Sequence, residues 1–163
     1  MIGQPPLLIG WREWAKLPML NIPLIKVKID TGAKTSALHA YDINIIKNNG
    51  KEFAEFIIHP IQRNDVICQK SRAKIIDIRT IRSSNGHSEK RILICSPIQI
   101  GSVKWDINIT LTNRDIMNHR MLLGREAMAK LLVNPSRSYC QGVVTKKQAL
   151  IIYKSIILPS DNC

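Results

Sequence analysis

The sequence lacks features that mark several large protein classes. Aromatic residues make up 5% of the 163 residues, and 12 acidic residues stand against 24 Lys and Arg. No apolar run reaches the roughly 18 residues that a membrane-spanning helix needs, so we expect no membrane contact. Neither a GxxxxGK[ST] phosphate loop nor an HExxH zinc motif is present. These absences argue against a P-loop nucleotide site and a zincin site, and we expect neither cofactor nor metal.

The cysteines are too scattered for a metal-ligand pattern. Cys68, Cys95, Cys140 and Cys163 include no CxxC pair. Free thiols in a reducing cytoplasm are the simplest interpretation, and two disulfides in an exported protein are the alternative. The first residues lack the basic start and long apolar segment of a signal peptide, which also favours the cytoplasm.

Positive charge and isoleucine are in excess. The net charge of +12 favours polyanionic partners without saying which kind. Isoleucine occurs 27 times, against 14 Leu and 6 Val, and β-branched side chains favour sheet over helix. The length suits one domain, and there is no internal repeat or linker. We therefore expect a single domain over residues 1–163, with an unassigned tail over 141–163.

Most of the chain alternates apolar and polar residues with a period of two, as half-buried strands do. The clearest predicted strands are Ile22–Ile29, Lys74–Arg82, Glu89–Cys95 and Val103–Leu111, the last joined by Gly101-Ser102 to a strand around Ile98 and Ile100. Asn85-Gly86 between the second and third is a strong hairpin signal. Only 125–133 has helical spacing. The pattern predicts an all-β fold with one short helix near 125–133.

A candidate catalytic motif follows the first of these strands. Asp30-Thr31-Gly32-Ala33 places a carboxylate at a strand end, in a loop where Thr can form locking hydrogen bonds and Gly allows close backbone approach. Aspartic proteases use two carboxylates that share one proton, one to activate water and one to protonate the scissile carbonyl. An ordinary strand-ending turn is the alternative interpretation.

A second motif lies downstream of the first. Leu122-Leu123-Gly124-Arg125, a hydrophobic-hydrophobic-Gly segment after a DTGA loop, resembles the second signature of retroviral-type aspartic proteases, the retropepsins. This resemblance implies an apolar strand beside the Asp30 loop, with Leu123 and Gly124 supporting the active site. It also implies that the hairpin around Asn85-Gly86 is the flap over the substrate.

The wider sequence resembles the bacterial proteins called ATP-dependent zinc proteases, a retropepsin-like domain. The matching motifs are Ile9-Gly10-Trp11-Arg12-Glu13-Trp14, Lys28-Ile29-Asp30-Thr31-Gly32-Ala33-Lys34-Thr35-Ser36-Ala37-Leu38-His39, Arg82-Ser83-Ser84-Asn85-Gly86-His87, Leu111-Thr112-Asn113-Arg114-Asp115 and Leu122-Leu123-Gly124-Arg125. The resemblance implies a closed or partly closed acid-protease-like β-barrel. It implies Asp30 as the catalytic residue and a functional link to an ATP-grasp glutamate ligase.

The histidines give the family's name little support. His39, His59, His87 and His119 occur singly, with no pair at helical spacing. A site assembled across strands stays open, but a lone histidine is more often structural. His87 lies beside the predicted hairpin tip, where contact with substrate is the functional alternative.

The single Asp-Thr-Gly supplies half of a dyad. A second Asp30 from a symmetry-related chain would complete it, so we expect a homodimer. Asp115 is the candidate for a second carboxylate within the chain, with a turn or ion-pair role as the alternative. The apolar run 149–158 and residues 7–9 are candidate interface strands, or else an edge strand or packed tail of the monomer.

The charge suggests a substrate preference. Arg79, Arg82, Lys90 and Arg91 lie on the two strands of the predicted flap, where a cationic roof would favour an acidic peptide such as a glutamate tail. We expect substrate contacts from Arg82, Ser84, Asn85, Gly86, His87 and Arg91. Few aromatics and no basic block argue against nucleic acid. The leading hypothesis is an aspartic peptidase, ahead of a non-catalytic peptide-binding module and a polyanion-binding β-domain.

Overall fold

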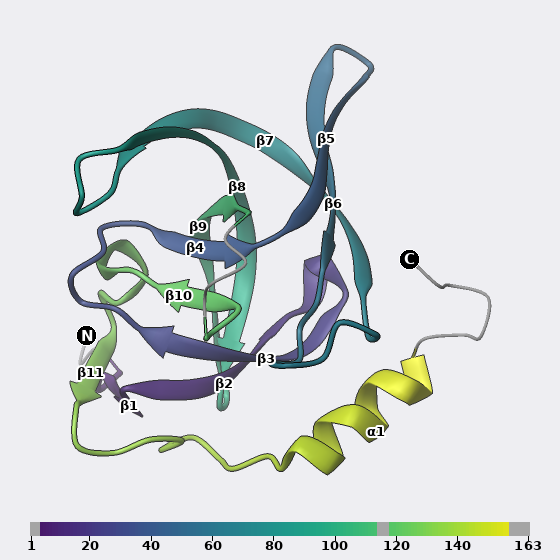
Figure 1. The fold of residues 1–163 in the computed structure, drawn as a ribbon. Helices are drawn as coiled ribbons and strands as arrows, with labels where there is room; N and C mark the ends of the chain where they lie inside the picture. Colours follow the sequence, from purple (N-terminus) through teal and green to yellow (C-terminus); the bar gives the residue numbers. More distant parts are fainter. Residues whose placement is uncertain (1–3, 114–117, 157–163) are drawn as a thin grey trace.

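A computed structural model describes residues 4–113 and 118–156 of the chain (Figure 1). Strands make up most of it. Their bounds are β1 Leu7–Gly10, β2 Arg12–Leu17, β3 Ile22–Ile29, β4 Ser36–His39, β5 Tyr41–Asn48, β6 Lys51–Ile58, β7 Gln69–Arg82, β8 Ser88–Ile100, β9 Val103–Thr112, β10 Met121–Leu123 and β11 Leu131–Asn134. The helical elements are the 3-10 turns η1 Pro18–Leu20 and η2 Arg125–Ala127 and the α-helix α1 Lys146–Ile156.

The main sheet closes on itself as a barrel. Its strand order is β2-β3-β10-β4-β9-β8-β7-β6-β5, and an additional pairing of β2 with β8 closes the first six strands. β7, β6 and β5 continue the sheet beyond the closure, and the long β7–β8 hairpin arches away from the barrel above β4 (Figure 1). The predicted all-β fold with a closed β-barrel is confirmed.

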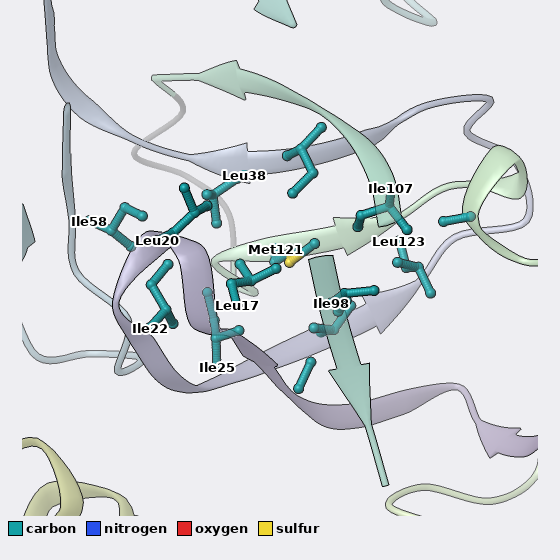
Figure 2. Packing of buried hydrophobic residues seen from close by; sticks show 14 of the residues in the cluster. Leu17, Leu20, Ile22, Ile25, Leu38, Ile58, Ile98, Ile107, Met121 and Leu123 are labelled. Carbon is teal, nitrogen blue, oxygen red and sulfur yellow. The ribbon is translucent and has the colours of Figure 1, made fainter. Parts of the chain in front are cut away.

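Period-two alternation fills the barrel with branched aliphatic side chains (Figure 2). In β3, Ile25, Val27 and Ile29 are buried while Lys28 between them is exposed. Ile107, Ile109 and Leu111 of β9 are buried in the same way. Because side chains alternate across a strand, one face of each strand supplies the core and the other carries charge. The strands and hairpins predicted from this pattern are confirmed.

Two predictions about helical and strand character are corrected. The helix expected over 125–133 is one 3-10 turn at η2, after which β11 pairs in parallel with β1, from Leu7↔Leu131 to Gly10↔Asn134. The run from 149, proposed as an interface or edge strand, belongs to α1 as far as Ile156. The remaining residues of that run lie outside the described residues. α1 packs against the barrel, with Ala149 and Tyr153 buried against Trp14 and Leu24. This agrees with the alternative interpretation of the run as a packed tail of the monomer.

The cysteines also depart from expectation. Cys95 and Cys140 carry free thiols, whereas Cys68 is disulfide-bonded, so the expectation of free thiols throughout is wrong. No helix among residues 4–113 and 118–156 is long and apolar enough to cross a bilayer.

Candidate active site

Asp30 begins the loop between β3 and β4, and backbone hydrogen bonds fix it there. Its N–H donates to the Leu123 carbonyl at 2.9 Å, and its own carbonyl accepts the Ala33 N–H at 3.2 Å. The carboxylate oxygen Oδ1 accepts the Gly32 N–H at 3.0 Å. A Cβ added at Gly32 would lie 3.2 Å from this oxygen. The carboxylate is thus held by the loop while the residue stays half-exposed.

The second motif lies directly beside this loop. β10 runs parallel to β3, with Leu122 opposite Lys28 and Leu123 opposite Ile29. Beyond β10, the Arg125 N–H donates to the Ala33 carbonyl at 2.9 Å. The structure therefore brings the predicted support residues Leu123 and Gly124 against the Asp30 loop, Leu123 by backbone pairing with β3.

Gly124 of the second motif packs directly against the backbone of the Asp30 loop. Its φ of −88° and ψ of 170° suit any residue, but an added Cβ would lie 2.5 Å from the Thr35 carbonyl carbon and 2.8 Å from the Thr35 oxygen. Its N–H donates to the buried Ser36 hydroxyl at 3.0 Å. The glycine is required here by space and not by backbone conformation.

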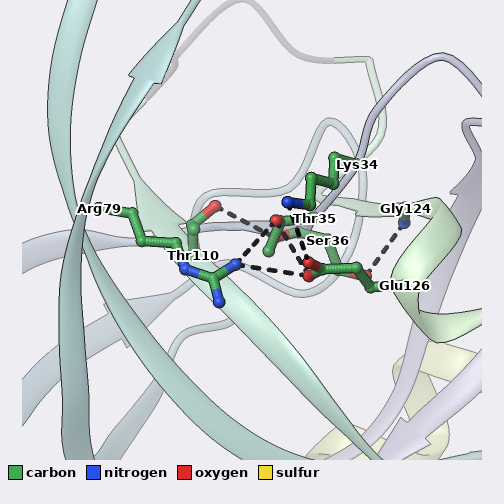
Figure 3. Close-up of polar contacts among 7 residues, drawn as sticks. All are labelled: Lys34, Thr35, Ser36, Arg79, Thr110, Gly124 and Glu126. Carbon is green, nitrogen blue, oxygen red and sulfur yellow. Dashed lines mark hydrogen bonds and ion pairs between the residues drawn. The ribbon is translucent and has the colours of Figure 1, made fainter.

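A polar cluster joins β7 to the residues that directly follow the two motifs (Figure 3). The Thr35 hydroxyl donates to Glu126 Oε2 at 3.1 Å, and Arg79 Nη1 donates to the Thr35 hydroxyl at 3.1 Å. Arg79 Nη1 also lies 3.4 Å from Glu126 Oε2, and Lys34 Nζ lies 3.9 Å from Glu126 Oε1. Each partner is partly exposed, so the ion pairs are individually weak. Their geometric effect is to tie β7 of the long hairpin to the Asp30 loop.

The prediction missed several residues of this region. Lys34, Thr35 and Ser36 follow the DTGA motif directly, and Glu126 follows the second motif by one residue. Arg125 also contacts the loop, because its Nη1 donates to the Thr31 carbonyl at 2.9 Å. Their positions in the sequence, next to the two motifs, are the signal that would identify these residues. Thr31, Gly32 and Ala33 occupy the loop where they were predicted.

The hairpin tip carries four of the predicted flap residues. Ser84, Asn85, Gly86 and His87 are all exposed at the end of the β7–β8 arch (Figure 1). The Gly86 φ of +86° is a conformation that favours glycine. The turn closes on itself, since the Ser83 N–H donates to the His87 carbonyl at 2.8 Å. The predicted hairpin is confirmed, and its function as a flap stays a prediction.

The two predicted flap arginines belong to opposite faces of this hairpin. Arg91 pairs with Arg79 across the strands, so these two share a face. Arg82 lies three residues beyond Arg79 and so falls on the other face, by the alternation of side chains. Arg91 is buried and donates to Glu89 at 2.9 Å, whereas Arg82 is exposed. The side chains of Arg79 and Arg91 therefore lie on the face of the hairpin toward the Asp30 loop. Each already contacts a carboxylate, that of Glu126 for Arg79 and that of Glu89 for Arg91.

The histidines do not gather around Asp30. Across residues 4–113 and 118–156, no three His, Cys, Asp or Glu side chains lie close enough together to hold a metal ion. His39 and His59 instead flank Tyr41, with ring centroids 4.4 Å and 4.8 Å from it. Asp115, the candidate second carboxylate within the chain, lies outside the described residues.

Comparisons with known proteins agree with this geometry. A probable alpha-L-glutamate ligase of Shewanella pealeana is 49% identical over 136 residues, covering 83% of this chain and 30% of the ligase. One of Desulfotalea psychrophila is 43% identical over 144 residues, covering 86% of this chain and 30% of the ligase. The chain thus spans under a third of these relatives' length.

A solved structure from Legionella pneumophila, of unknown function, superposes with a TM-score of 0.70 at 25% identity, covering 83% of this chain and 98% of that one. The family model for RimB-like proteins, described as retropepsin-like aspartic endopeptidase RimB, matches residues 8–143. With the Asp30 loop and the second motif both inside that match, the chain belongs to the RimB-like family of retropepsin-like proteins.

Proposed function

We propose that the protein is an aspartic-type peptidase whose catalytic carboxylate is Asp30. The placement of Asp30 carries the proposal: its backbone is held by the Leu123 carbonyl, and one carboxylate oxygen is held by the Gly32 N–H. A half-exposed carboxylate fixed in this way is ready to take a proton from water. The family match adds support, since its model describes an aspartic endopeptidase.

The reaction needs a second carboxylate, and we propose that it comes from Asp30 of a second copy of the chain. In such a dyad the ionised carboxylate takes a proton from water, and the resulting oxygen attacks the carbonyl carbon of the peptide bond. The protonated carboxyl meanwhile donates its proton to the carbonyl oxygen. The sequence has one Asp-Thr-Gly, and Glu126, the nearest acidic residue of the second motif, is already bonded to Thr35 and Arg79.

We further propose an acidic substrate, in particular a peptide that carries glutamate residues. The relatives named probable alpha-L-glutamate ligase favour this choice, since they contain a region similar to this chain. It also fits a functional link with such a ligase. Lys34, Arg79 and Arg125 surround the Asp30 loop and provide cationic groups for carboxylates. Arg91 faces the same side of the flap and would have to exchange Glu89 for a substrate carboxylate.

Binding without catalysis is the second candidate. It is favoured by the single carboxylate of the motif, because one chain on its own offers a fixed acid and no dyad. A peptide would then bind under the β7–β8 hairpin and dissociate without being cleaved. A polyanion-binding β-domain is the third and least specific hypothesis, since it rests on the net charge alone.

The test compares the wild type with Asp30→Asn on glutamate-tailed and casein-like peptides, with and without a chelator. Cleavage that disappears in Asp30→Asn and survives the chelator is the expected result. Asp106→Asn is the matched control, because it removes an exposed carboxylate on β9. Peptide binding without cleavage in both proteins would favour the second candidate, and equal cleavage by wild type and Asp30→Asn would remove Asp30 from the mechanism.

A further inference from the structure

A pocket of about 600 Å³ lies between β2, β3, the start of α1 and two loops, those around 60–65 and 118–120. In Figure 1, α1 runs below β2 and β3, away from the β7–β8 hairpin. The residues that line the pocket include none from the Asp30 loop and none from Leu122–Arg125. The pocket is therefore a different site from the proposed catalytic one, of a size that suits a small ligand or a short peptide segment.

Positive charge dominates its lining. The cations are Arg12, Lys26, Arg63, Arg120 and Lys146, and the acid among the lining residues is Asp65. Asp65 is bonded to Arg120 Nη2 at 3.1 Å. The other four cations form no ion pair with a carboxylate among residues 4–113 and 118–156. The lining thus keeps an uncompensated charge that favours an anion.

Aromatic rings hold two of these cations in place without neutralising them. The Arg12 guanidinium lies 4.5 Å from the centroid of Trp11 and 4.9 Å from that of Tyr139. Lys26 Nζ lies 5.2 Å from the Trp14 centroid. A cation–π contact orients a charge but leaves its hydrogen-bond donors free. The two cations are therefore positioned in advance, which lowers the entropy cost of binding an anion.

Buried polar atoms without partners gather in the same place. Within the described part of the chain, Arg12 Nε, Arg120 Nε and Trp14 Nε1 are buried and have no acceptor, and His119 Nε2 has no hydrogen-bond partner. All four residues line the pocket, and Arg120 is 8% exposed. A buried donor left unpaired costs about 1–3 kcal/mol, so several of them around one cavity point to an acceptor that completes them.

The electrostatics at His119 agree with this geometry. Burial lowers the pKa of His119, and the nearby charges of Lys28, Arg12 and Lys26 lower it further. The ring packs edge-on against Trp11 with centroids 6.0 Å apart. An anion in the pocket would oppose the three cations and favour the imidazolium form. The His119 pKa is therefore a direct reporter of occupancy.

We propose that this pocket binds a multivalent oxyanion, a ligand that carries two or more carboxylate or phosphate groups. The Arg12 guanidinium provides N–H donors for one oxyanion group, and Lys26 and Lys146 provide charge for a second. Arg120 already donates to Asp65 and to the Tyr41 hydroxyl, so its further contribution is the unpartnered Nε. The ligand is either the side chains of an acidic peptide or a small phosphorylated molecule. The site does not depend on peptidase activity at Asp30.

The experiment measures binding of tetraglutamate and tripolyphosphate to the full chain and to Asp30→Asn by calorimetry, at about 0.15 M salt to screen diffuse attraction. Tetraglutamine serves as the neutral probe. We expect saturable binding of at least one anion to both proteins, no binding of tetraglutamine, and a raised His119 pKa at saturation by NMR. Tighter binding of tetraglutamate assigns the site to acidic peptide, and tighter binding of tripolyphosphate assigns it to phosphate.

Variants locate the binding. Arg12→Gln and Lys26→Gln should each weaken binding by about tenfold, the effect of one charge-assisted hydrogen bond. Lys104→Gln removes one exposed positive charge from β9, away from the pocket, and should change the affinity less than twofold. Circular dichroism checks that each variant folds. The proposal is overturned if neither anion saturates, if the His119 pKa does not rise, or if Lys104→Gln weakens binding as much as Lys26→Gln.

Discussion

Gly124→Ala tests the close packing of the two motifs that position Asp30. The added Cβ would lie 2.5 Å from the Thr35 carbonyl carbon, 2.8 Å from the Thr35 oxygen and 2.9 Å from the Lys34 oxygen. These are backbone atoms and cannot rotate away. Since non-bonded carbons pack at roughly 3.5 Å or more, the two segments would have to separate by about 1 Å.

The magnitude follows from three contributions. The Gly124 backbone angles suit alanine, so the substitution by itself would stabilise the protein by about 0.4–1 kcal/mol through the unfolded state. Overpacking costs about 1–3 kcal/mol and sometimes more. Separation also breaks the buried hydrogen bond from the Gly124 N–H to the Ser36 hydroxyl, which costs about another 1–3 kcal/mol. The expected net loss is about 1–6 kcal/mol, centred on about 3 kcal/mol.

Urea unfolding measures this loss as a lower midpoint at unchanged slope. Gly50→Ala is the control, because Gly50 has a φ of +73° and nothing near its Cβ position. That variant should lose about 1–2 kcal/mol from backbone conformation alone. A loss at Gly124→Ala no larger than at Gly50→Ala would refute the packing argument.

Three further predictions concern single side chains. Ser36→Ala leaves the buried Gly124 N–H without its acceptor and should cost about 1–3 kcal/mol in urea unfolding; a loss under about 0.5 kcal/mol would contradict the bond. Glu126→Gln removes two exposed ion pairs and should cost under about 1 kcal/mol. It should also speed amide exchange in β7, and unchanged exchange would mean that the cluster does not hold the β7–β8 hairpin. Burial raises the pKa of Tyr153 above its ordinary value of 10.0, so its contribution to stability is complete below about pH 10 and is lost as the pH rises further. Tyr153→Phe should therefore lose less stability than the wild type between about pH 9 and pH 11 in urea unfolding, and equal losses would show that Tyr153 does not govern this range.

The sequence predicted the parts of the fold that depend on local pattern. The hairpin around Asn85-Gly86 and the strand before Asp30 follow from alternation and turn residues, which are read within a few positions. The Asp30 motif follows from a carboxylate at a strand end, and the second motif from a family resemblance. The parallel pairing of β10 with β3 places the two side by side.

The errors have identifiable causes. The residues of β11 form an apolar run whose state is decided by pairing with β1, more than a hundred positions earlier. The β-branched run of α1 was interpreted as a strand because its N-terminal signal was overlooked. Thr145 and Gln148 form a capping box, with the Thr145 N–H donating to Gln148 Oε1 at 2.9 Å and the Gln148 N–H donating to Thr145 Oγ1 at 3.2 Å.

The cationic pocket could not be predicted from spacing at all. Its residues come from β2, β3, two loops and α1, and each looks like an ordinary surface cation in the sequence. Two groups stand out among the 24 Lys and Arg: one beside the Asp30 loop and one lining the pocket beside α1. The second group is brought together by the packing of α1 against Trp14 and Leu24.

A mixing experiment tests the central claim, that the active site is an Asp30 pair from two chains. Wild type and Asp30→Asn are unfolded together at equal concentrations, refolded so that chains exchange, and assayed on a glutamate-tailed peptide. If each site needs one Asp30 from each of two chains, random pairing leaves about one quarter of the dimers fully competent, so activity per total chain falls to about one quarter. Activity of one half, the value for chains that act independently, would contradict the account.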